Sequence, residues 1–288
     1  MVNLRPGSTT RARVRAMEDG RQVVRRDTLA TEEPLEIRLL AGEARQTLAI
    51  TMRTPGNDFE LAAGFCHGEG LVTGREEISQ LSYCTDPDID AEQQYNIVNV
   101  KLAHDVLPEL RGLERHFTTT SACGVCGKAS LDALKLRGCP LVSEGPEVDA
   151  TTLYRLPDAL REAQGLFSST GGLHAAGLFT ADGELVCLRE DVGRHNAVDK
   201  LVGWALLAGK LPLHNHLLMV SGRSSYEIMQ KALVAGIPIV CAVSAPSSLA
   251  VDLAAEFGMT LVGFLRGQRF NLYAGAERVR LPVLSPPS

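Results

Sequence analysis

The sequence predicts an α/β protein: a three-layer sheet in the C-terminal half, preceded by a smaller α+β N-terminal part. After Gly171, short apolar runs alternate with helical patterns, which is typical of a sheet covered by helices. Before that point, strand and helix signals are mixed and weaker. The 288 residues suffice for two ordinary domains. We expect a basic tail over residues 1–27, an α+β domain over residues 28–145 that ends in a C-x-x-C loop, and a sheet domain over residues 146–288.

Individual elements follow from hydrophobic periodicity and from capping residues. Residues 48–52 alternate like a half-buried strand, and Asn57 or Asp58 caps a short helix. A helix is expected to open at Leu156–Pro157, with the proline in its first turn. Asp182–Gly183 predicts a hairpin, beyond which the sheet should be largely parallel. The other expected strands cover residues 97–102, 173–179, 184–188, 217–220, 237–243 and 260–264, and the helices residues 194–208, 226–235 and 247–257.

This order of elements resembles the cytidine-deaminase fold, so the C-terminal sheet is expected to be cytidine-deaminase-like. Those deaminases bind zinc through H-x-E at the start of one helix and P-C-x-x-C at the start of the next. Here no glutamate stands two residues after His195, and Ser221–Gly222–Arg223–Ser224–Ser225 contains no cysteine. A catalytic zinc needs about three converging protein ligands. The sequence therefore predicts neither deaminase chemistry nor a bound metal.

Composition and charge exclude several classes of protein. The chain is 45% hydrophobic and 22% charged, an ordinary globular balance. Its formal net charge is −5, whereas proteins that bind nucleic acid through overall charge are basic. No run of about 18 apolar residues exists. The start, with Arg11, Arg13 and Arg15, lacks the apolar segment of a signal peptide and is expected to be a loose tail. Seven cysteines, an odd number, do not suggest a disulfide framework. We expect a cytoplasmic protein without nucleic-acid or membrane partners.

The sharpest local feature is a pair of thiols, Cys123 and Cys126, in the segment Ser121–Ala122–Cys123–Gly124–Val125–Cys126–Gly127–Lys128. The flanking glycines favour an exposed turn in which both sulfur atoms are accessible. The final lysine of the segment and a helix expected over residues 129–136 place positive charge near Cys126. Both features favour the thiolate over the thiol and so raise its reactivity.

Three interpretations of this motif compete. A structural zinc site would need His116 and Cys139 as further ligands, but these two do not form a second C-x-x-C pair. A thioredoxin-like redox pair normally opens a helix after a strand. A thiolate that accepts sulfur and passes it on as a persulfide fits an exposed loop equally well. The motif alone does not choose between the last two. The other five cysteines lie mostly within apolar patterns and are expected in the core.

A second group of polar residues lies around the carboxyl ends of the predicted strands, where open α/β sheets bind ligands. Helix N-termini together with Arg194 and Arg223 suit phosphate oxygens. His195, beside these charges, is expected to be functional, whereas Ser247 and Ser248 are expected to cap a helix. The group comprises residues 171–174, 190–196, 221–225 and 244–248.

A third feature directly follows the last parallel strand and is the segment Phe264–Leu265–Arg266–Gly267–Gln268–Arg269. Two arginines on either side of a glycine leave backbone amides accessible, and such a segment can hold a pyrophosphate. An exposed turn would have the same sequence, so the segment by itself is a weak signal. Its place at the carboxyl end of a strand adds it to the expected ligand crevice.

Taken together, these segments resemble the formate dehydrogenase accessory sulfurtransferase family (FdhD). The resemblance extends from about Thr28 to Val279 and leaves out the arginine-rich start. The matching stretches are Arg53–Thr54–Pro55–Gly56, Glu60–Leu61–Ala62, residues 121–128, Glu190–Asp191–Val192–Gly193–Arg194–His195–Asn196–Ala197, Ser221–Gly222–Arg223, Ser244–Ala245–Pro246 and Gly263–Phe264–Leu265–Arg266.

The resemblance implies a sulfurtransferase that takes sulfur from a cysteine desulfurase and delivers it to a molybdenum cofactor, the bis-molybdopterin guanine dinucleotide form. A formate dehydrogenase would be the recipient, and homodimers are implied. By matching position, Cys123 is the expected persulfide carrier and Cys126 its partner. Phe264 to Arg269 would bind the cofactor and its guanine nucleotide fragments, with His195 and Arg223 close by.

Two other functions stay open at this point. A disulfide oxidoreductase would use Cys123 and Cys126 but would need no nucleotide site, so the polar crevice counts against it. A non-catalytic carrier that only binds and protects the cofactor would need the crevice but neither cysteine. Sulfur on the Cys123 peptide after incubation with a desulfurase separates these functions.

Overall fold

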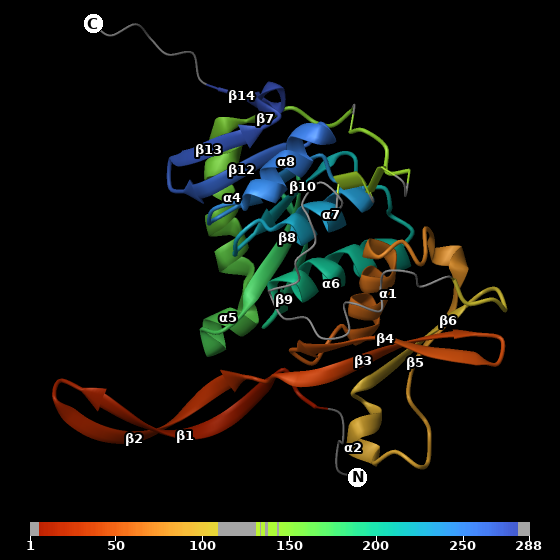
Figure 1. Ribbon diagram of the computed structural model, residues 1–288. Helices are drawn as coiled ribbons and strands as arrows, with labels where there is room; N and C mark the ends of the chain where they lie inside the picture. Colours follow the sequence, from red (N-terminus) through yellow and green to blue (C-terminus); the bar gives the residue numbers. More distant parts are fainter. Residues whose placement is uncertain (1–5, 109–130, 133, 136–137, 143, 282–288) are drawn as a thin grey trace, which may run out of the picture.

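The computed structural model describes residues 6–108, 131–132, 134–135, 138–142 and 144–281 (Figure 1). It contains a six-stranded sheet, a four-stranded sheet and a long two-stranded ribbon. Cys123 and Cys126 lie outside the described residues, so their expected role as an accessible thiol pair stays a prediction. In the part that is described, no helix is long and apolar enough to cross a membrane.

The six-stranded sheet forms the C-terminal half, with the strand order β13-β12-β11-β10-β8-β9. The central strands β10, β11 and β12 are parallel, while β8 is antiparallel to both β9 and β10. The expectation of a largely parallel sheet beyond the hairpin is wrong at its edge, because β13 returns antiparallel to β12. The strands are β8 (His174–Thr180), β9 (Leu185–Asp191), β10 (His216–Val220), β11 (Ile239–Ala242), β12 (Thr260–Arg266) and β13 (Arg269–Ala274).

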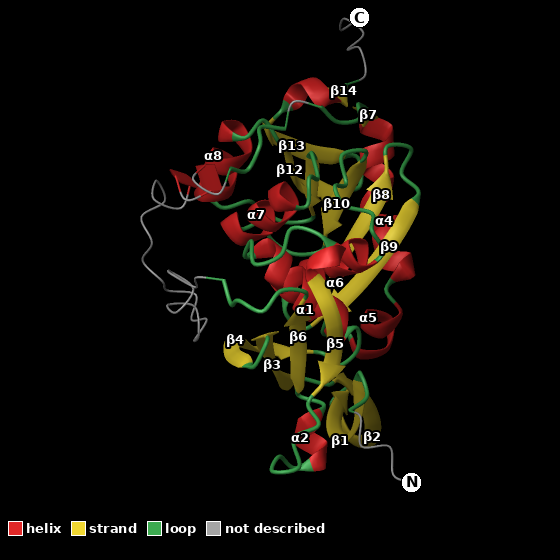
Figure 2. Cartoon of the chain, turned by 90° about the vertical axis from the view of Figure 1, so that its right-hand side faces the viewer, coloured by secondary structure: helices red, strands yellow, loops and turns green. Residues whose placement is uncertain are grey.

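Helices cover both faces of this sheet, which confirms the predicted three layers (Figure 2). Alternate residues of β10 face opposite layers: Leu218 and Val220 pack with one core cluster, Leu217 and Met219 with the other. The first cluster joins α6 (Arg194–Leu207), α7 (Tyr226–Val234) and α8 (Ser248–Glu256) to the sheet, and the second joins α4 (Ala150–Ala163) to it. The expected C-terminal helices are thus present. The likeness to cytidine deaminases stays a prediction.

Helix α4 begins earlier than the sequence predicts. It starts at Ala150, so Pro157 lies inside the helix rather than in its first turn. The proline signal was misplaced because Leu153, Leu156 and Leu160 already form one fully buried helical stripe against the sheet, and this burial outweighs the missing N–H. The short helix α5 (Gly165–Thr170) follows directly and packs near the base of the ribbon.

The N-terminal part is a four-stranded sheet with the order β4-β3-β6-β5, covered on one face by α1 (Asp58–Gly68). Its expected strands and its short helix are all present. The strands are β3 (Glu33–Ala41), β4 (Ala44–Arg53), β5 (Ile78–Tyr83) and β6 (Ile97–Leu102). The remaining elements are small: η1 (Arg75–Glu77), α2 (Ala91–Gln94), β7 (Val148–Asp149), η3 (Ala276–Arg278) and β14 (Val279–Arg280).

Helix α1 lies against α6 and joins the two halves of the molecule at a close backbone crossing. A Cβ atom on Gly64 would stand 1.9 Å from the Asp199 carbonyl oxygen, and one on Gly203 would stand 1.8 Å from the Glu60 carbonyl oxygen. Any other residue would force the helices apart, because the obstructing atoms are backbone. The crossing therefore requires glycine on both helices.

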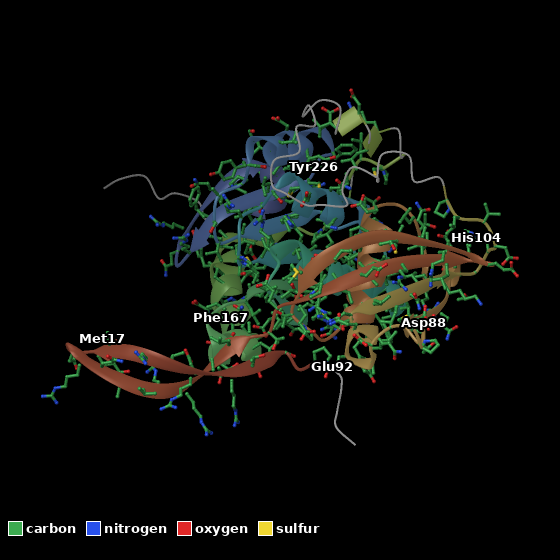
Figure 3. The ribbon with its side chains drawn as sticks, turned by 60° about the horizontal axis from the view of Figure 1, so that its bottom comes forward. Met17, Asp88, Glu92, His104, Phe167 and Tyr226 are labelled. Carbon is green, nitrogen blue, oxygen red and sulfur yellow. The ribbon has the colours of Figure 1, made fainter. Side chains whose placement is uncertain are left out.

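The start of the chain is not a loose tail where the structure describes it. Residues 9–30 form the antiparallel strands β1 (Thr9–Glu18) and β2 (Arg21–Ala30), a ribbon that projects from the body (Figures 1 and 3). Arg13 stands directly opposite Arg26, a like-charge pair that weakens a ribbon. The first strand does alternate in sequence, with exposed Arg11, Arg13 and Arg15 between partly exposed small residues. No residue of either strand is buried, so the pattern lacks the buried apolar face that marks a strand.

Candidate functional site

The structure brings the predicted polar segments to one edge of the large sheet. Strands β9, β10, β11 and β12 run in the same direction, so their carboxyl ends lie at this edge. Strand β8 runs the opposite way and places its amino end there. The segments concerned are residues 171–174, 190–196, 221–225, 244–248 and 264–269. The two faces of the sheet meet at this edge. We call the face covered by α6, α7 and α8 the α6 side and the face covered by α4 the α4 side.

On the α6 side, Asp191 is the centre of a buried network. Its carboxylate is fully buried, 2.7 Å from the Lys200 Nζ, and it accepts hydrogen bonds from the backbone N–H groups of Thr54 at 3.1 Å and Gly193 at 2.8 Å. Lys200 also donates to the Thr54 carbonyl oxygen at 2.8 Å. A buried ion pair with all its hydrogen bonds made holds geometry. Asp191 thus ties the sheet edge to the N-terminal part.

Asn196, from the same segments, strengthens this joint, and Arg53 fixes the end of β4 on its N-terminal side. The Asn196 Nδ2 donates to the Met52 carbonyl oxygen at 2.7 Å, and the Thr51 hydroxyl donates to Asn196 Oδ1 at 3.2 Å. Arg53, fully buried, donates to Asp58 at 3.1 Å and to the Asn96 side chain at 2.9 Å. The Asn196 bonds hold the two halves of the molecule together, whereas those of Arg53 lie within the N-terminal part.

His195 lies at the start of α6 and is already engaged. Its Nε2 is 3.0 Å from both the Ser225 hydroxyl and the Glu227 carboxylate. Desolvation, followed by the positive charges of Arg194 and Lys231, lowers the pKa of His195 to about 3, so the imidazole is neutral at physiological pH. A neutral imidazole offers a hydrogen bond but no charge to an anion.

Arg223 is exposed in the loop between β10 and α7, at the same edge. Beside it, Ser224 is fully buried, and its hydroxyl finds no hydrogen-bond partner within the described part of the chain. Ser247 accepts a hydrogen bond from the Ala250 N–H and caps α8, which confirms the cap expected there.

The predicted segment Phe264–Arg269 comprises the end of β12, the two-residue turn at Gly267 and Gln268, and the first residue of β13. Phe264 has a φ of 52°, a left-handed conformation that is rare for an aromatic residue, and its N–H donates to the Ser244 carbonyl oxygen at 3.2 Å. Arg266 is held by a bond from its Nε to the Val243 carbonyl oxygen at 2.9 Å. Leu265 is fully buried and packs in the core cluster on the α4 side of the sheet. The two hydrogen bonds of Phe264 and Arg266 tie the end of β12 to the segment that follows β11.

On the α4 side of the edge lies a cavity of about 480 Å³, within the range of ligand pockets. The predicted edge contributes His174, Ser221 and Arg266 to its wall. The opposite wall comes from α4 and α5. It is lined by Pro157, Asp158, Leu160, Arg161, Gln164 and Phe167, together with Leu173, Val243, Leu265 and Gly267.

Three contacts fix the α4–α5 wall. Glu190, at the end of β9, accepts from the N–H groups of Leu166 at 3.0 Å and Phe167 at 2.8 Å and so anchors α5. The Arg161 guanidinium lies over the Phe167 ring, 3.8 Å from its centroid. Gln164, at the junction of the two helices, is only 3% exposed.

His174 enters the cavity from the start of β8. Burial first, and then the charge of Arg194, lower the pKa of His174 below its ordinary value. This imidazole is therefore also neutral at pH 7. Arg266 and Arg161 are the cationic groups that line the cavity.

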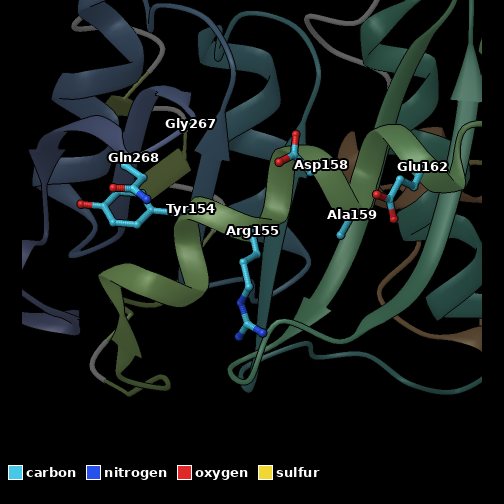
Figure 4. Close-up of a pocket in the computed structure, with 7 residues that line it drawn as sticks. All are labelled: Tyr154, Arg155, Asp158, Ala159, Glu162, Gly267 and Gln268. Atoms are coloured by element: carbon cyan, nitrogen blue, oxygen red, sulfur yellow. The ribbon is translucent and has the colours of Figure 1, made fainter.

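A second hollow of about 520 Å³ adjoins this cavity along α4 (Figure 4). Asp158 and Gly267 line both. Figure 4 shows Tyr154 and Gln268 close together at one end of the hollow, with Arg155, Ala159 and Glu162 along the helix. The predicted segment 264–269 therefore stands between two hollows, and α4 provides the facing wall of each.

Sequence reasoning found only part of this site. Leu265, Arg266 and Gly267 line the cavity and Gln268 the adjoining hollow, whereas His195 and Arg223 are not among the lining residues of either. The α4–α5 wall was missed altogether. Nothing in the pattern around Asp158, Arg161 and Gln164 distinguishes these residues from the polar face of an ordinary helix.

The core cysteines are unsuited to nucleophilic chemistry, which confirms the expectation for four of the five. Cys66, Cys84, Cys187 and Cys241 are buried, while Cys139 is partly exposed. Burial raises the pKa of Cys66 and of Cys241 to about 12 and that of Cys187 to about 11. These three thiols stay protonated at neutral pH.

Comparison with known proteins identifies the family. The FdhD/NarQ family model matches residues 30–280. The sulfur carrier protein FdhD of Streptomyces coelicolor is 56% identical over 276 residues, covering 95% of this chain and 96% of that protein. That of Sulfurisphaera tokodaii is 46% identical over 269 residues, with 93% and 98% covered. The crystal structure of a formate dehydrogenase accessory protein from Desulfotalea psychrophila matches with a TM-score of 0.70 at 26% identity, covering 94% of this chain and 99% of that one. The chain belongs to the FdhD/NarQ family.

Proposed function

We propose that this chain is a sulfurtransferase that carries sulfur as a persulfide on Cys123 and delivers it to the molybdenum cofactor of a formate dehydrogenase. The observation that carries the proposal is the high identity, over nearly the whole chain, to proteins named sulfur carrier protein FdhD. The pair Cys123 and Cys126 supplies the chemistry that such a name requires. A reducing cytoplasm, where thiols persist, suits this chemistry.

Sulfur acceptance is a thiol–disulfide exchange. The Cys123 thiolate attacks the outer sulfur of a cysteine persulfide on the donor, a cysteine desulfurase. A new sulfur–sulfur bond forms on Cys123, the donor's sulfur–sulfur bond breaks, and the donor cysteine leaves as a thiolate. No electrons are gained or lost overall. The step needs an accessible thiolate, which the buried core cysteines do not provide.

Release of the sulfur has two routes that the residues allow. In the first, the Cys126 thiolate attacks the inner sulfur of the Cys123 persulfide, hydrosulfide leaves, and a Cys123–Cys126 disulfide remains. A dithiol reductant must then restore both thiols. In the second route, Cys126 only shields the persulfide from water until the acceptor takes the terminal sulfur. Both routes place the acceptor beside Cys123.

The acceptor is a substrate, bis-molybdopterin guanine dinucleotide, which carries pyrophosphates. The structure offers cationic and polar groups for it at the carboxyl edge of the sheet. Arg266 lines the cavity together with Leu265 and Gly267, at the end of β12 and the turn that follows it. Arg223 and His195 lie at the same edge, on the α6 side, and we propose that they contact the cofactor beyond the cavity. Guanidinium groups match phosphate oxygens in shape and charge.

The experiment that tests this function is the mass of the protein after incubation with a cysteine desulfurase and cysteine. We expect one added sulfur atom on the Cys123 peptide, lost on reduction and absent in Cys123→Ala. The matched control is Cys139→Ala, which removes a partly exposed thiol outside the motif and should accept sulfur normally. Full activation of the dehydrogenase by a folded Cys123→Ala protein would instead favour a carrier that only binds the cofactor.

A further inference from the structure

We propose that the free edge of strand β1 binds an extended acidic segment of a partner protein, which joins the ribbon as a third strand with carboxylates at alternate positions. The inference goes beyond the proposed function, because it uses neither the cysteine pair nor the carboxyl edge of the large sheet. The ribbon projects from the body (Figures 1 and 3). It lies almost entirely before residue 30, where the match to the family begins.

The first observation is that all charges on one face of the ribbon are positive. Residues that stand directly opposite each other in an antiparallel pair share a face, and alternate residues of a strand lie on opposite faces. The pairing of β1 with β2 therefore puts four arginines on one face, which we call the arginine face, with no acidic residue among them. These arginines are Arg11, Arg13, Arg15 and Arg26.

The opposite face of the ribbon is electrically balanced. It carries Glu18 and Asp27 together with Arg21 and Arg25, and Glu18 pairs with Arg25 at 2.9 Å. Residues 9–30 as a whole hold six arginines and three acidic residues, a formal charge of +3 in a chain whose net charge is −5. The positive charge of the ribbon is thus gathered on one face, on an arm of an otherwise acidic protein.

The second observation is that the arginine face has no counter-charge of its own. Arg13 stands directly opposite Arg26, and like charges in this position destabilise a strand pair. Among the described residues, the Glu18–Arg25 pair is the only ion pair in the ribbon, and it lies on the other face. Arg11, Arg13 and Arg15 are all exposed. A row of carboxylates beside β1 would relieve the repulsion that the ribbon itself leaves.

The third observation is the direction of the backbone groups of β1. The Ser8 carbonyl oxygen accepts from the Thr31 N–H at 2.9 Å, so this pair bonds across the ribbon. Bonded and non-bonded pairs alternate along an antiparallel ladder, which makes the odd-numbered residues of β1 the non-bonded ones. The N–H and carbonyl groups of Arg11, Arg13 and Arg15 therefore point to the outer edge. In the part of the chain that is described, no other strand pairs with that edge.

These observations together specify the partner. Successive arginines of β1 are about 6.8 Å apart, the repeat of every second residue in an incoming strand. Carboxylates at alternate positions of that strand would each stand beside an arginine, while its backbone pairs with the outward N–H and carbonyl groups. A nucleic acid supplies phosphates but cannot pair with a strand edge. A charged edge also prevents aggregation of sheets, but that role does not require charges of one sign on one face.

The test is fluorescence polarisation of the full chain with a labelled eight-residue peptide in which glutamate and threonine alternate. We expect this peptide to bind at least about fivefold more tightly than one of the same composition with its glutamates in adjacent pairs, because adjacent pairs place half of the carboxylates on the wrong face. Arg13→Gln should weaken binding about threefold and Arg13→Glu about tenfold. The second substitution puts a carboxylate opposite Arg26, so the ribbon stays paired.

Two further measurements separate strand addition from simple charge attraction. Hydrogen exchange at the amides of Arg11, Arg13 and Arg15 should slow when the alternating peptide is bound, because these N–H groups become bonded. A peptide of the same sequence with N-methyl groups on alternate backbone nitrogens keeps its charge and should lose binding. Retained binding of the N-methylated peptide would contradict the third strand.

The matched control is Arg21→Gln, which removes the same charge from the opposite face of the ribbon. It should bind the alternating peptide as the parent does. The inference is overturned by absence of binding, by equal affinity for the two peptide orders, or by equal effects of the Arg13→Gln and Arg21→Gln substitutions. Tighter binding of a DNA duplex than of the alternating peptide would also overturn it and would point to a nucleic acid instead.

Discussion

The two sides of the sheet edge carry similar polar residues but use them differently. On the α6 side, Asp191, Asn196 and Lys200 are buried and form hydrogen bonds with one another and with the N-terminal part. On the α4 side, Gln164 is equally buried, yet its amide is left without a partner in the part of the chain that is described, and Asp158 forms no ion pair there.

The difference teaches that a polar motif at the carboxyl end of a strand is not by itself a ligand site. Where a second element packs over the edge, as the loop after β4 does here, the polar groups become a joint. Where the covering helix leaves a cavity, the same kind of residue stays available. Asp191 and Asn196 have their hydrogen bonds made and the Gln164 Nε2 does not within the described part of the chain, although all three are buried polar residues near the same edge.

The largest expected effect is on the α6 side. Asp191→Asn keeps the volume but leaves the buried Lys200 ammonium without its counter-charge, so we expect a loss of about 3–5 kcal/mol in the free energy of unfolding. Urea denaturation measures this loss. Asp182→Asn, in the exposed hairpin turn, is the control and should change stability by less than about 0.5 kcal/mol. Equal free energies of unfolding for the two variants would show that the Asp191–Lys200 pair does not stabilise the contact between the two halves.

Next in size is the helix crossing beneath that side. Gly203→Ala places a methyl group against the backbone of α1, and we expect about 1–3 kcal/mol of destabilisation as the helices move apart. Thermal unfolding followed by circular dichroism measures it. Gly172→Ala, where the nearest atom to an added Cβ is 3.9 Å away, should have almost no effect. A similar melting temperature for both variants would contradict the tight crossing.

On the α4 side the expected effect is on binding rather than on stability. Arg266→Ala removes an exposed guanidinium that faces the cavity, and we expect GMP affinity to fall by about one decade, the loss of one charge-assisted hydrogen bond. Calorimetry measures the affinity, and urea denaturation should find the stability unchanged within about 0.5 kcal/mol. A destabilised Arg266→Ala variant with normal GMP affinity would show that Arg266 has a structural role and no role in binding.

The smallest effect concerns the pH dependence of His195. Its pKa is about 3 in the folded chain and about 6.5 when unfolded, so below pH 6.5 only the unfolded chain takes up the proton. The free energy of unfolding is therefore unaffected by this group above pH 6.5 and decreases as the pH falls from 6.5 towards 3. Between pH 7.5 and pH 5, we expect the parent to lose on the order of 1 kcal/mol more than His195→Gln, because Glu227 and solvent moderate the shift. Parallel pH profiles of the two proteins would show that the imidazole is not desolvated.

Much of the fold was predictable because its elements bury one regular face. The strands and helices after Gly171 lie almost where periodicity put them, and the segment 264–269 was correctly placed at the sheet edge. Three predictions failed for local reasons. The ribbon over residues 9–30 buries too little for its pattern to show, Pro157 lies inside α4 because leucine burial outweighs its cost, and β13 follows a turn that resembles a loop.

The sequence by itself determined the three-layer sheet, the edge where its polar segments meet and the family to which the chain belongs, because local periodicity and contiguous motifs suffice for these. Only the tertiary structure decided which polar residues are available to a ligand. Asp191 and Asn196 form a joint because Thr54 and Met52, more than 130 residues earlier, pack onto them. Asp158 and Gln164 face a cavity because α4 packs across the edge of the sheet. Whether a polar group is satisfied depends on such distant contacts, and no local pattern contains them.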